Sequence, residues 1–191
     1  YFILFFIGSV VMRSAGCVIN DILDKKIDKK VKRTQSRPLA SSKLTILKAC
    51  VTLVILLLIG LLILINLNMP SIILGFLIIP LVILYPLAKR FFALPQLILA
   101  MTYNWGCMIG WVAISSPYNF NNIFILYLSL VIWTIVYDTI YAVQDEEEDR
   151  KMNLYSTALL FGSKKLLIIN SLIIIQYFLL MREKIHIHFP L

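Results

Sequence analysis

The sequence lacks the cysteine spacings that mark a zinc site or a disulfide framework. Its three cysteines, Cys17, Cys50 and Cys107, stand singly in apolar stretches, with no CxxC or Cys/His pattern among them. We expect them to be packing residues of membrane helices. Gly/Ser-rich linkers and low-complexity tracts are also missing, so the whole chain, residues 1–191, is predicted to be one membrane-embedded domain.

Two further absences concern the ends of the chain. It opens on YFILFFIGSVVM without an initiating methionine or a basic leader, so no cleavable signal peptide is evident. It closes on MREKIHIHFPL, which puts charge where an uncharged external loop is expected. We therefore expect a chain truncated at both ends, with His186 and His188 as tail residues and not as metal ligands.

Apolar residues make up 60% of the chain, against about 45–50% in soluble domains. The sequence is that of an integral membrane protein, and the predicted fold class is an all-α, polytopic transmembrane bundle. Six segments are long enough to cross roughly 30 Å of hydrocarbon. They are residues 1–22, 44–65, 71–88, 97–114, 123–143 and 166–181.

The connections between these segments alternate in charge. Loops 66–70 and 115–122 carry none, whereas loops 23–43, 89–96 and 144–165 contain eight, two and four of the 18 Lys and Arg residues. By the positive-inside rule the charged loops face the cytoplasm, or the matrix of a mitochondrion. The net charge of +8 thus reflects membrane topology, and no nucleic-acid partner is expected.

Three prolines, Pro80, Pro86 and Pro95, punctuate the third and fourth spans. Proline is tolerated in a membrane helix where neighbouring groups satisfy the carbonyls that it frees. We interpret these prolines as kinks that open a cavity, with plain helix packing as the alternative.

An acid-rich face is predicted where the first span ends. At 100° per residue, one helix places four oxygen-bearing side chains within an arc of roughly 100°. They are Asn20, Asp21, Asp24 and Asp28. Crowded carboxylates repel each other unless a proton or a cation neutralises them, and hard oxygen ligands at this spacing suit Mg²⁺. The alternative is a solvated, charged helix end. Cations that could hold a phosphate follow at once: Lys29, Lys30, Lys32, Arg33 and Arg37.

A second acidic cluster follows the fifth span, in YDTIYAVQDEEED. It places Asp145 and Asp149 four residues apart. Nearby angles of the same helix carry Tyr137, Asp138 and Tyr141. The three glutamates between the aspartates point away from them and are interpreted as a solvated face. Both clusters end a span on the same membrane side, and two facing carboxylate clusters suit two Mg²⁺ ions that clamp a diphosphate.

Arg13 and Asp138 are the charges most deeply embedded in apolar sequence. An ionisable residue within a span suggests a function. We hypothesise that the two pair, directly or through a network beneath the metal ions; alternatively, Arg13 contacts the diphosphate or the acceptor. A third motif, YPLAKR, ends on Lys89 and Arg90, whose cations either set topology or bind diphosphate oxygens.

Three motifs in order resemble those of the UbiA family of intramembrane prenyltransferases. CVINDILDKKIDKKVKRTQSRPLAS resembles the family's NDxxDxxxD signature with trailing RTxxRPLAS, YPLAKR resembles its YPxxKR, and YDTIYAVQDEEED with STALLFG resembles its second acidic motif. The resemblance covers nearly the whole chain. It implies a helical bundle around a central cavity, usually of nine membrane helices, that transfers a polyprenyl group from a polyprenyl diphosphate to an aromatic acceptor with the help of Mg²⁺. The two acidic motifs most resemble those of members that use 4-hydroxybenzoate in ubiquinone biosynthesis, in the inner membrane of bacteria or mitochondria.

The resemblance also assigns roles to individual residues. It implies Mg²⁺ ligands at Asn20, Asp24, Asp145 and Asp149, with Asp21 and Asp28 in or beside that shell. The expected catalytic residues are Asp24, Asp145 and Asp149. The implied diphosphate binders are Arg33, Arg37, Lys89 and Arg90. Family members commonly have glycine at the position of Asn153 and lysine at the position of Tyr155. The first departure concerns the shape of the local loop, and the second concerns one cationic contact.

The implied chemistry is ionisation of an allylic diphosphate. The carbocation that forms must avoid water, which an apolar interior excludes. Aromatic faces such as those of Tyr141, Tyr103 or Trp105 could stabilise its positive charge, with ordinary packing as the alternative for each. The polyprenyl tail needs a lateral opening to the lipid bilayer.

Two other functions fit parts of the pattern. A transporter of cations or phosphate compounds also places charges inside a bundle, but it needs polar residues along a path through the membrane, and the outer loops here are uncharged. A non-catalytic relic would insert into the bilayer and fail to turn over, because missing helices would leave its cavity open to lipid.

Overall fold

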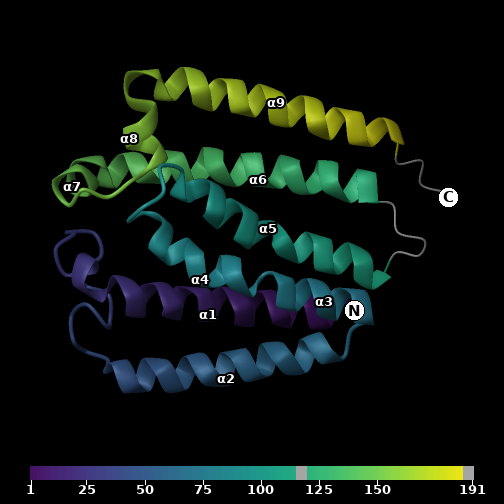
Figure 1. Cartoon of the computed structure of the whole chain (residues 1–191), viewed down its shortest axis with the longest axis horizontal. Coiled ribbons are helices and arrows are strands. Elements are labelled where there is room, and N and C mark those ends of the chain that lie inside the picture. Colours follow the sequence, from purple (N-terminus) through teal and green to yellow (C-terminus); the bar gives the residue numbers. More distant parts are fainter. Residues whose placement is uncertain (115–119, 187–191) are drawn as a thin grey trace. The chain divides into compact units, whose positions relative to one another are not determined.

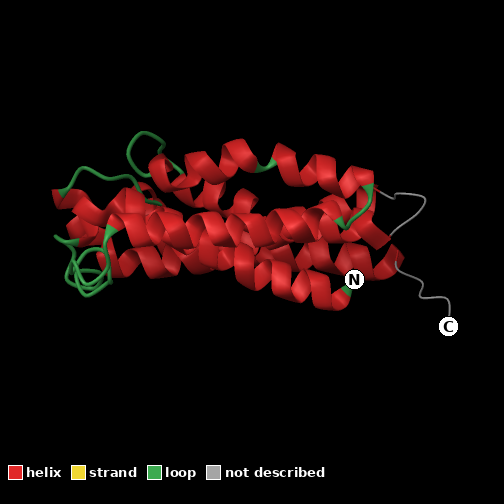
Figure 2. Cartoon of the chain, turned by 90° about the horizontal axis from the view of Figure 1, so that it is seen from below, coloured by secondary structure: helices red, strands yellow, loops and turns green. Residues whose placement is uncertain are grey.

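The structure is a computed structural model that describes residues 1–114 and 120–186. Within these ranges it consists of helices joined by loops, with no strand (Figure 2). Six helical segments of the described chain are long and apolar enough to cross a membrane: Phe2–Asp28, Ile46–Ile65, Met69–Ala88, Pro95–Ile114, Asn122–Lys151 and Thr157–Arg182. The predicted all-α class and the six predicted spans are confirmed, and the chain is a multi-pass membrane protein. The side chains of His186 and His188 lie outside the described residues.

The chain divides into two compact units, Tyr1–Leu77 and Ile78–Leu191. The first unit contains the helices α1 (Phe2–Asp28), α2 (Ile46–Ile65) and α3 (Met69–Leu77) (Figure 1). The second contains α4 (Ile79–Ala88), α5 (Pro95–Ile114), α6 (Phe120–Ala142), a 3₁₀ turn (Val143–Asp145), α7 (Glu146–Lys151), α8 (Thr157–Phe161), a further 3₁₀ turn (Gly162–Lys164) and α9 (Lys165–His186). The prediction of one domain stays a prediction.

Close packing in the first unit involves a glycine of α2. Helices α1 and α2 lie side by side (Figure 1). A Cβ atom on Gly60 would lie 2.6 Å from the Sδ atom of Met12 in α1, so glycine leaves the room that this side chain occupies, as small residues do between membrane helices. Helix α2 begins after Thr45, whose Oγ1 accepts a hydrogen bond from the N–H of Lys48 at 3.4 Å.

Polar side chains join α5 and α6 within the apolar spans of the second unit. The Nδ2 atom of Asn104 in α5 donates to the carbonyl of Leu130 at 3.2 Å and to Oγ1 of Thr134 at 2.7 Å, both in α6. The hydroxyl of Tyr127 in α6 donates in return to the carbonyl of Met101 at 2.9 Å. Hydrogen bonds between helices are favourable in lipid because no water competes for these groups. They hold α6, which also packs against α9, in one register with α5.

The prolines lie at different points of their helices. Pro95 is the first residue of α5, where a helix needs no N–H hydrogen bond. The kink interpretation is therefore wrong for Pro95. Pro80 is the second residue of α4, just after the helical span is interrupted at Ile78, and Pro86, which is buried, lies inside α4.

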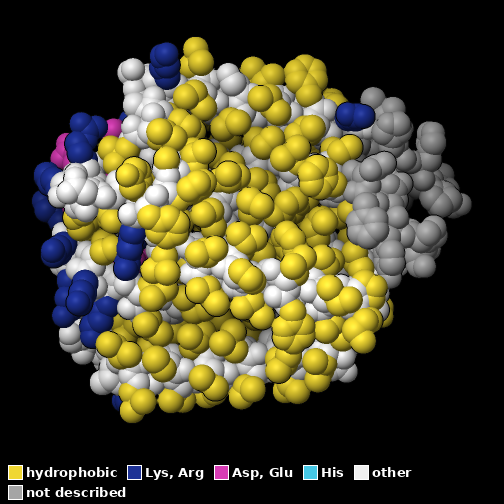
Figure 3. Space-filling view, viewed as in Figure 1, with side chains coloured by type: hydrophobic (Ala, Val, Ile, Leu, Met, Phe, Trp, Pro, Cys, Tyr) yellow, Lys and Arg dark blue, Asp and Glu magenta, His cyan; other side chains and the backbone are white. Residues whose placement is uncertain are grey.

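Apolar side chains cover the flanks of the helices in each unit, and most of the Lys and Arg side chains in view gather near helix ends (Figure 3). Leu47, Leu166 and Phe178 are 74%, 72% and 66% exposed. Such surfaces suit hydrocarbon and not water. In the second unit the charged loops before α5 and after α6 lie at the same end, because the N–H of Tyr155 donates to the carbonyl of Lys89 at 2.8 Å. Within this unit the arrangement agrees with the predicted alternation of loop charge.

Candidate functional site

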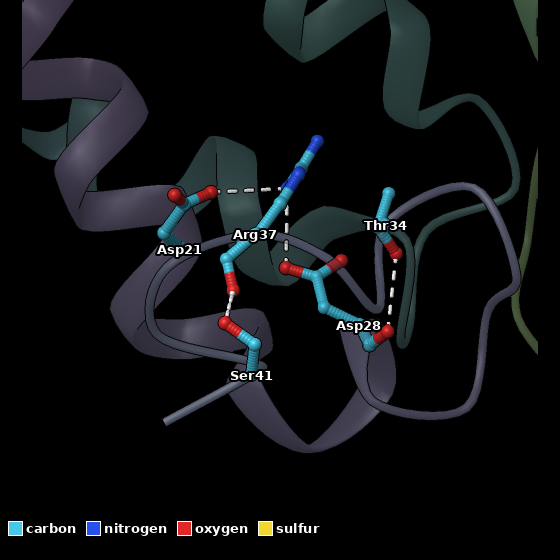
Figure 4. Close-up of polar contacts among 5 residues, drawn as sticks. All are labelled: Asp21, Asp28, Thr34, Arg37 and Ser41. Carbon is cyan, nitrogen blue, oxygen red and sulfur yellow. Dashed lines mark hydrogen bonds and ion pairs between the residues drawn. The ribbon is translucent and has the colours of Figure 1, made fainter. Parts of the chain in front are cut away.

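One arginine pairs with two carboxylates on the acidic face of α1. Nη1 of Arg37 lies 3.0 Å from Oδ1 of Asp21 and 3.1 Å from Oδ2 of Asp28, and pairs with both carboxylates (Figure 4). The two aspartates are about two helical turns apart on the helix, so a single guanidinium spans much of the predicted face. Its charge reduces the repulsion between the carboxylates.

A run of tight turns after α1 brings Arg37 back to this face. The N–H of Thr34 donates to the carbonyl of Val31 at 3.1 Å, and the N–H of Arg37 donates to the carbonyl of Thr34 at 3.0 Å. The hydroxyl of Thr34 reaches the carbonyl of Asp28 at 3.3 Å and ties the loop to the last residue of the helix. Ser41 donates to the carbonyl of Arg37 at 2.8 Å (Figure 4). The loop therefore fixes the backbone of Arg37 on both sides.

The four oxygen-bearing residues of α1 differ in how deeply they are buried. Asp24 has no exposed surface and Asp28 is 5% exposed, whereas Asn20 and Asp21 are partly exposed. Among the residues that the structure describes, no three His, Cys, Asp or Glu side chains converge closely enough to hold an ion by themselves. Mg²⁺, however, usually takes one or two carboxylates together with substrate phosphates. The all-oxygen donors of α1 therefore fit a magnesium–phosphate complex.

The second acidic cluster is not carried by one continuous α-helix. Helix α6 ends at Ala142, a 3₁₀ turn covers Val143–Asp145, and α7 begins at Glu146. A 3₁₀ turn advances about 120° per residue, so the angles predicted for Tyr141 relative to the two aspartates are wrong. Asp145 lies in the turn and Asp149 in α7, and both side chains are partly buried.

Glu146 has a structural role that its sequence context did not reveal. Its carboxylate pairs with Nζ of Lys165, the first residue of α9, and lies 3.4 Å from Nη2 of Arg150. The solvated-face interpretation is therefore wrong for Glu146, while Glu147 has an exposed side chain as predicted. The four-residue spacing to Arg150 was a usable signal. No local pattern pointed to Lys165.

Asn153 ends α7 in a conformation that glycine usually adopts. Its φ is 52°, its N–H donates to the carbonyl of Arg150 at 3.3 Å, and the next N–H, of Leu154, donates to the carbonyl of Asp149 at 2.9 Å. These two bonds form a Schellman motif, in which asparagine is the usual substitute for glycine. The chain therefore keeps a left-handed residue at the position where the family resemblance implies glycine.

We expect Asn153→Gly to keep or raise the thermal stability of the protein, because glycine adopts a positive φ without a steric cost. Asn153→Val should lower the free energy of unfolding by about 1–2 kcal/mol, because a β-branched side chain is strained at this φ. Thermal unfolding in detergent measures both changes. Asn170→Val in α9 is the control and should not lower the melting temperature. Equal stability of the glycine and valine variants would contradict the assignment of Asn153 to a left-handed conformation.

The third motif lies against the segment after α7. The bond from the N–H of Tyr155 to the carbonyl of Lys89 joins them, and the side chain of Lys89 is partly buried while that of Arg90 is exposed. A second bond runs from the N–H of Thr157 to Oε1 of Gln96 at 3.0 Å. The second unit thus brings together two of the three motifs. Sequence reasoning assigned no role to Gln96 or Thr157.

Several other predicted site residues lie at the surface of their unit. The side chains of Arg13, Arg33 and Tyr141 are exposed. Arg13 and Asp138 lie in different units, so their pairing stays a prediction. Trp105 packs edge to face against Tyr127, with ring centroids 5.9 Å apart, which supports a packing role for this tryptophan.

Comparisons with known proteins agree with the motifs. The profile of the UbiA prenyltransferase family matches residues 1–187. The chain is 52% identical over 159 residues to the mitochondrial 4-hydroxybenzoate polyprenyltransferase of Drosophila pseudoobscura pseudoobscura, and this match covers 83% of the chain and 40% of that protein. It is 45% identical over 164 residues to the 4-hydroxybenzoate octaprenyltransferase of Francisella tularensis subsp. novicida, with 86% and 57% covered. The chain therefore spans about half the length of these curated relatives.

A solved structure gives the same fold. The UbiA homologue from Archaeoglobus fulgidus, bound to GPP and Mg²⁺, matches 98% of this chain and 67% of its own with a TM-score of 0.80. The two sequences are 16% identical, so this likeness concerns the fold alone.

Proposed function

Because this chain belongs to the UbiA prenyltransferase family, we propose that it transfers a polyprenyl group from a polyprenyl diphosphate to an aromatic acceptor. The acceptor that we propose is 4-hydroxybenzoate, in ubiquinone biosynthesis, because relatives at 52% and 45% identity are named for it. The structural observation that carries the proposal is the acidic face of α1 with Arg37 paired to Asp21 and Asp28. Oxygen donors beside a fixed cation are what a metal-bound diphosphate requires.

The metal ion in this proposal is Mg²⁺. The residues that would hold it are Asn20, Asp24, Asp145 and Asp149, with Asp21 and Asp28 in or beside the same shell. Mg²⁺ and GPP are bound in the Archaeoglobus fulgidus homologue, and the oxygen donors of α1 fit the same ion. When bound, Mg²⁺ supplies positive charge that stabilises a departing diphosphate. A single site built from both acidic clusters is part of the proposal, since the clusters lie in different units.

The cationic side chains would bind the diphosphate oxygens and stabilise the charge that grows as the allylic C–O bond breaks. These are Arg33, Arg37, Lys89 and Arg90, with Arg13 as a further candidate. The electron pair of the C–O bond leaves with the diphosphate. The ring carbon ortho to the hydroxyl of 4-hydroxybenzoate then attacks the allylic carbocation, a C–C bond forms, and that ring carbon loses its proton. The apolar interior would exclude water, and Tyr141 would offer an aromatic face to the cation.

We place the site on the cytoplasmic side of a bacterial inner membrane or on the matrix side of the mitochondrial inner membrane. The distribution of Lys and Arg among the loops supports this orientation. The lipid bilayer would deliver the polyprenyl diphosphate laterally, because its tail is confined to hydrocarbon.

Prenyl transfer can be tested with membranes that contain the protein. Radiolabelled polyprenyl diphosphate is offered with 4-hydroxybenzoate or with other hydroxybenzoates and naphthoates. We expect prenylated 4-hydroxybenzoate to form with Mg²⁺, to disappear when EDTA removes the metal, and to return when Mg²⁺ is restored. If no acceptor is prenylated in the presence of Mg²⁺, the proposal is wrong. Movement of labelled phosphate across vesicles without any product would indicate a transporter instead.

A further inference from the structure

A buried polar node joins three helices of the second unit. The node consists of Gln96 in α5, Thr139 in α6 and Thr157, the first residue of α8. The two threonine hydroxyls lie 2.7 Å apart, and neither residue has exposed surface. The N–H of Thr157 donates to Oε1 of Gln96, which is 7% exposed, at 3.0 Å. The start of α8 is therefore bonded to both α5 and α6.

The direction of the hydroxyl bond follows from the number of protons. Oγ1 of Thr139 lies 2.6 Å from the carbonyl of Ile135 and donates its single proton there. Thr157 must then donate to Thr139. Both donors of Thr157, its N–H and its O–H, thus depend on acceptors from other helices. Loss of either acceptor leaves a buried donor unsatisfied, which costs more than the bond itself contributes.

The node stands between two parts of the proposed site. Gln96 follows the Lys89 and Arg90 cations in sequence, and Thr157 follows the segment with Asp145 and Asp149. The bond from Tyr155 to the carbonyl of Lys89 joins the same two segments at a second point. Between Asp149 and Tyr155, the Schellman motif at Asn153 restricts the backbone. Two hydrogen bonds therefore join the segment that follows Asp145 and Asp149 to the segment that contains Lys89 and Arg90.

We propose that Gln96, Thr139 and Thr157 are positioning residues for the prenyl transfer reaction. They fix Asp145 and Asp149 relative to Lys89 and Arg90, so that acids and cations act on one diphosphate. This inference rests on the proposed function. The node residues act through the acids and cations, and misplacing such groups by about 1 Å can cost up to about a hundredfold in rate.

Substitutions at Gln96 test this role. Gln96→Leu removes the acceptor, whereas Gln96→Glu keeps an oxygen at the same chain length. We expect Gln96→Leu to raise KM for the polyprenyl diphosphate, or to lower kcat, by about tenfold or more, with KM for the aromatic acceptor unchanged. Gln96→Glu should restore wild-type kinetics. Thr102→Val is the matched control, because its hydroxyl bonds within α5, to the carbonyl of Ile98.

Hydrogen exchange supplies a readout that needs no activity. The amides of Tyr155 and Thr157 should be protected in the wild type, and Gln96→Leu should speed exchange at Thr157 by about tenfold or more while α9 stays unchanged. Thr139→Val, which removes the acceptor of the Thr157 hydroxyl, is the second variant if Gln96→Leu fails to insert. Rapid exchange of both amides in the wild type, or wild-type kinetics of Gln96→Leu, would overturn the proposal. If the wild type prenylates no acceptor, the proposed function fails and the positioning role fails with it, whereas wild-type kinetics of Gln96→Leu in an active enzyme overturn the positioning role alone.

Discussion

Asp24→Asn is expected to lower the rate of prenyl transfer by about a hundredfold to a thousandfold, while the protein still inserts into the membrane. Asp24 is fully buried in α1, and asparagine keeps its size while removing the charge that would bind Mg²⁺. Fixed charges in a site that excludes water contribute strongly to the transition state, and removing one group of this kind costs about a hundredfold to a thousandfold. Insertion should persist because a neutral amide is less costly in lipid than a carboxylate.

The measurement is the initial rate of labelled product per amount of inserted protein. Asp145→Asn should give a comparable loss, because the proposal places both aspartates on the same metal–diphosphate complex. Glu147→Gln is the matched control: it removes one carboxylate from the exposed side of α7 and should leave the rate unchanged. Full activity of either aspartate variant would count decisively against metal binding at that residue.

Arg37→Gln is expected to change two affinities in opposite directions. Binding of the polyprenyl diphosphate should weaken by about a hundredfold, because hydrogen-bonded charge pairs lose about 2–5 kcal/mol when one partner is truncated. Binding of a divalent metal in the absence of diphosphate should strengthen, because Asp21 and Asp28 are released from their ion pairs with the guanidinium. If Arg37 had a purely structural role, its substitution would weaken the binding of both the diphosphate and the metal.

Titration with Mn²⁺, followed by electron paramagnetic resonance, measures metal binding without turnover. The KM for the diphosphate gives the other affinity. Lys43→Gln removes an exposed cation from the same loop and serves as the control, with neither affinity changed. Arg37→Lys should fall between wild type and Arg37→Gln, because an ammonium keeps the charge but not the planar donor geometry. If Arg37→Gln binds diphosphate as tightly as the wild type, Arg37 does not contact this substrate.

The helical repeat was sufficient to group Asn20, Asp21, Asp24 and Asp28 on one face, because neighbours along a helix are set by local geometry. It could not select Arg37 from the five cations that follow. That choice depends on the turns between Val31 and Ser41 and on the bond from Thr34 to the last carbonyl of α1. For the same reason the sequence did not predict the 3₁₀ turn over Val143–Asp145, which breaks the α-helical periodicity that the prediction assumed.

Hydropathy and loop charge, which are properties of short stretches, were enough to locate six membrane spans and the all-α class, because lipid requires each span to satisfy its own backbone. The partners of Glu146 and Gln96 were hidden from such an analysis. These partners, Lys165 and Thr157, lie 19 and 61 residues away in the chain, and contacts at that separation come from the packing of helices against one another. Local composition therefore established where the chain crosses the membrane, whereas the folded packing established which polar groups meet at the ends of those crossings.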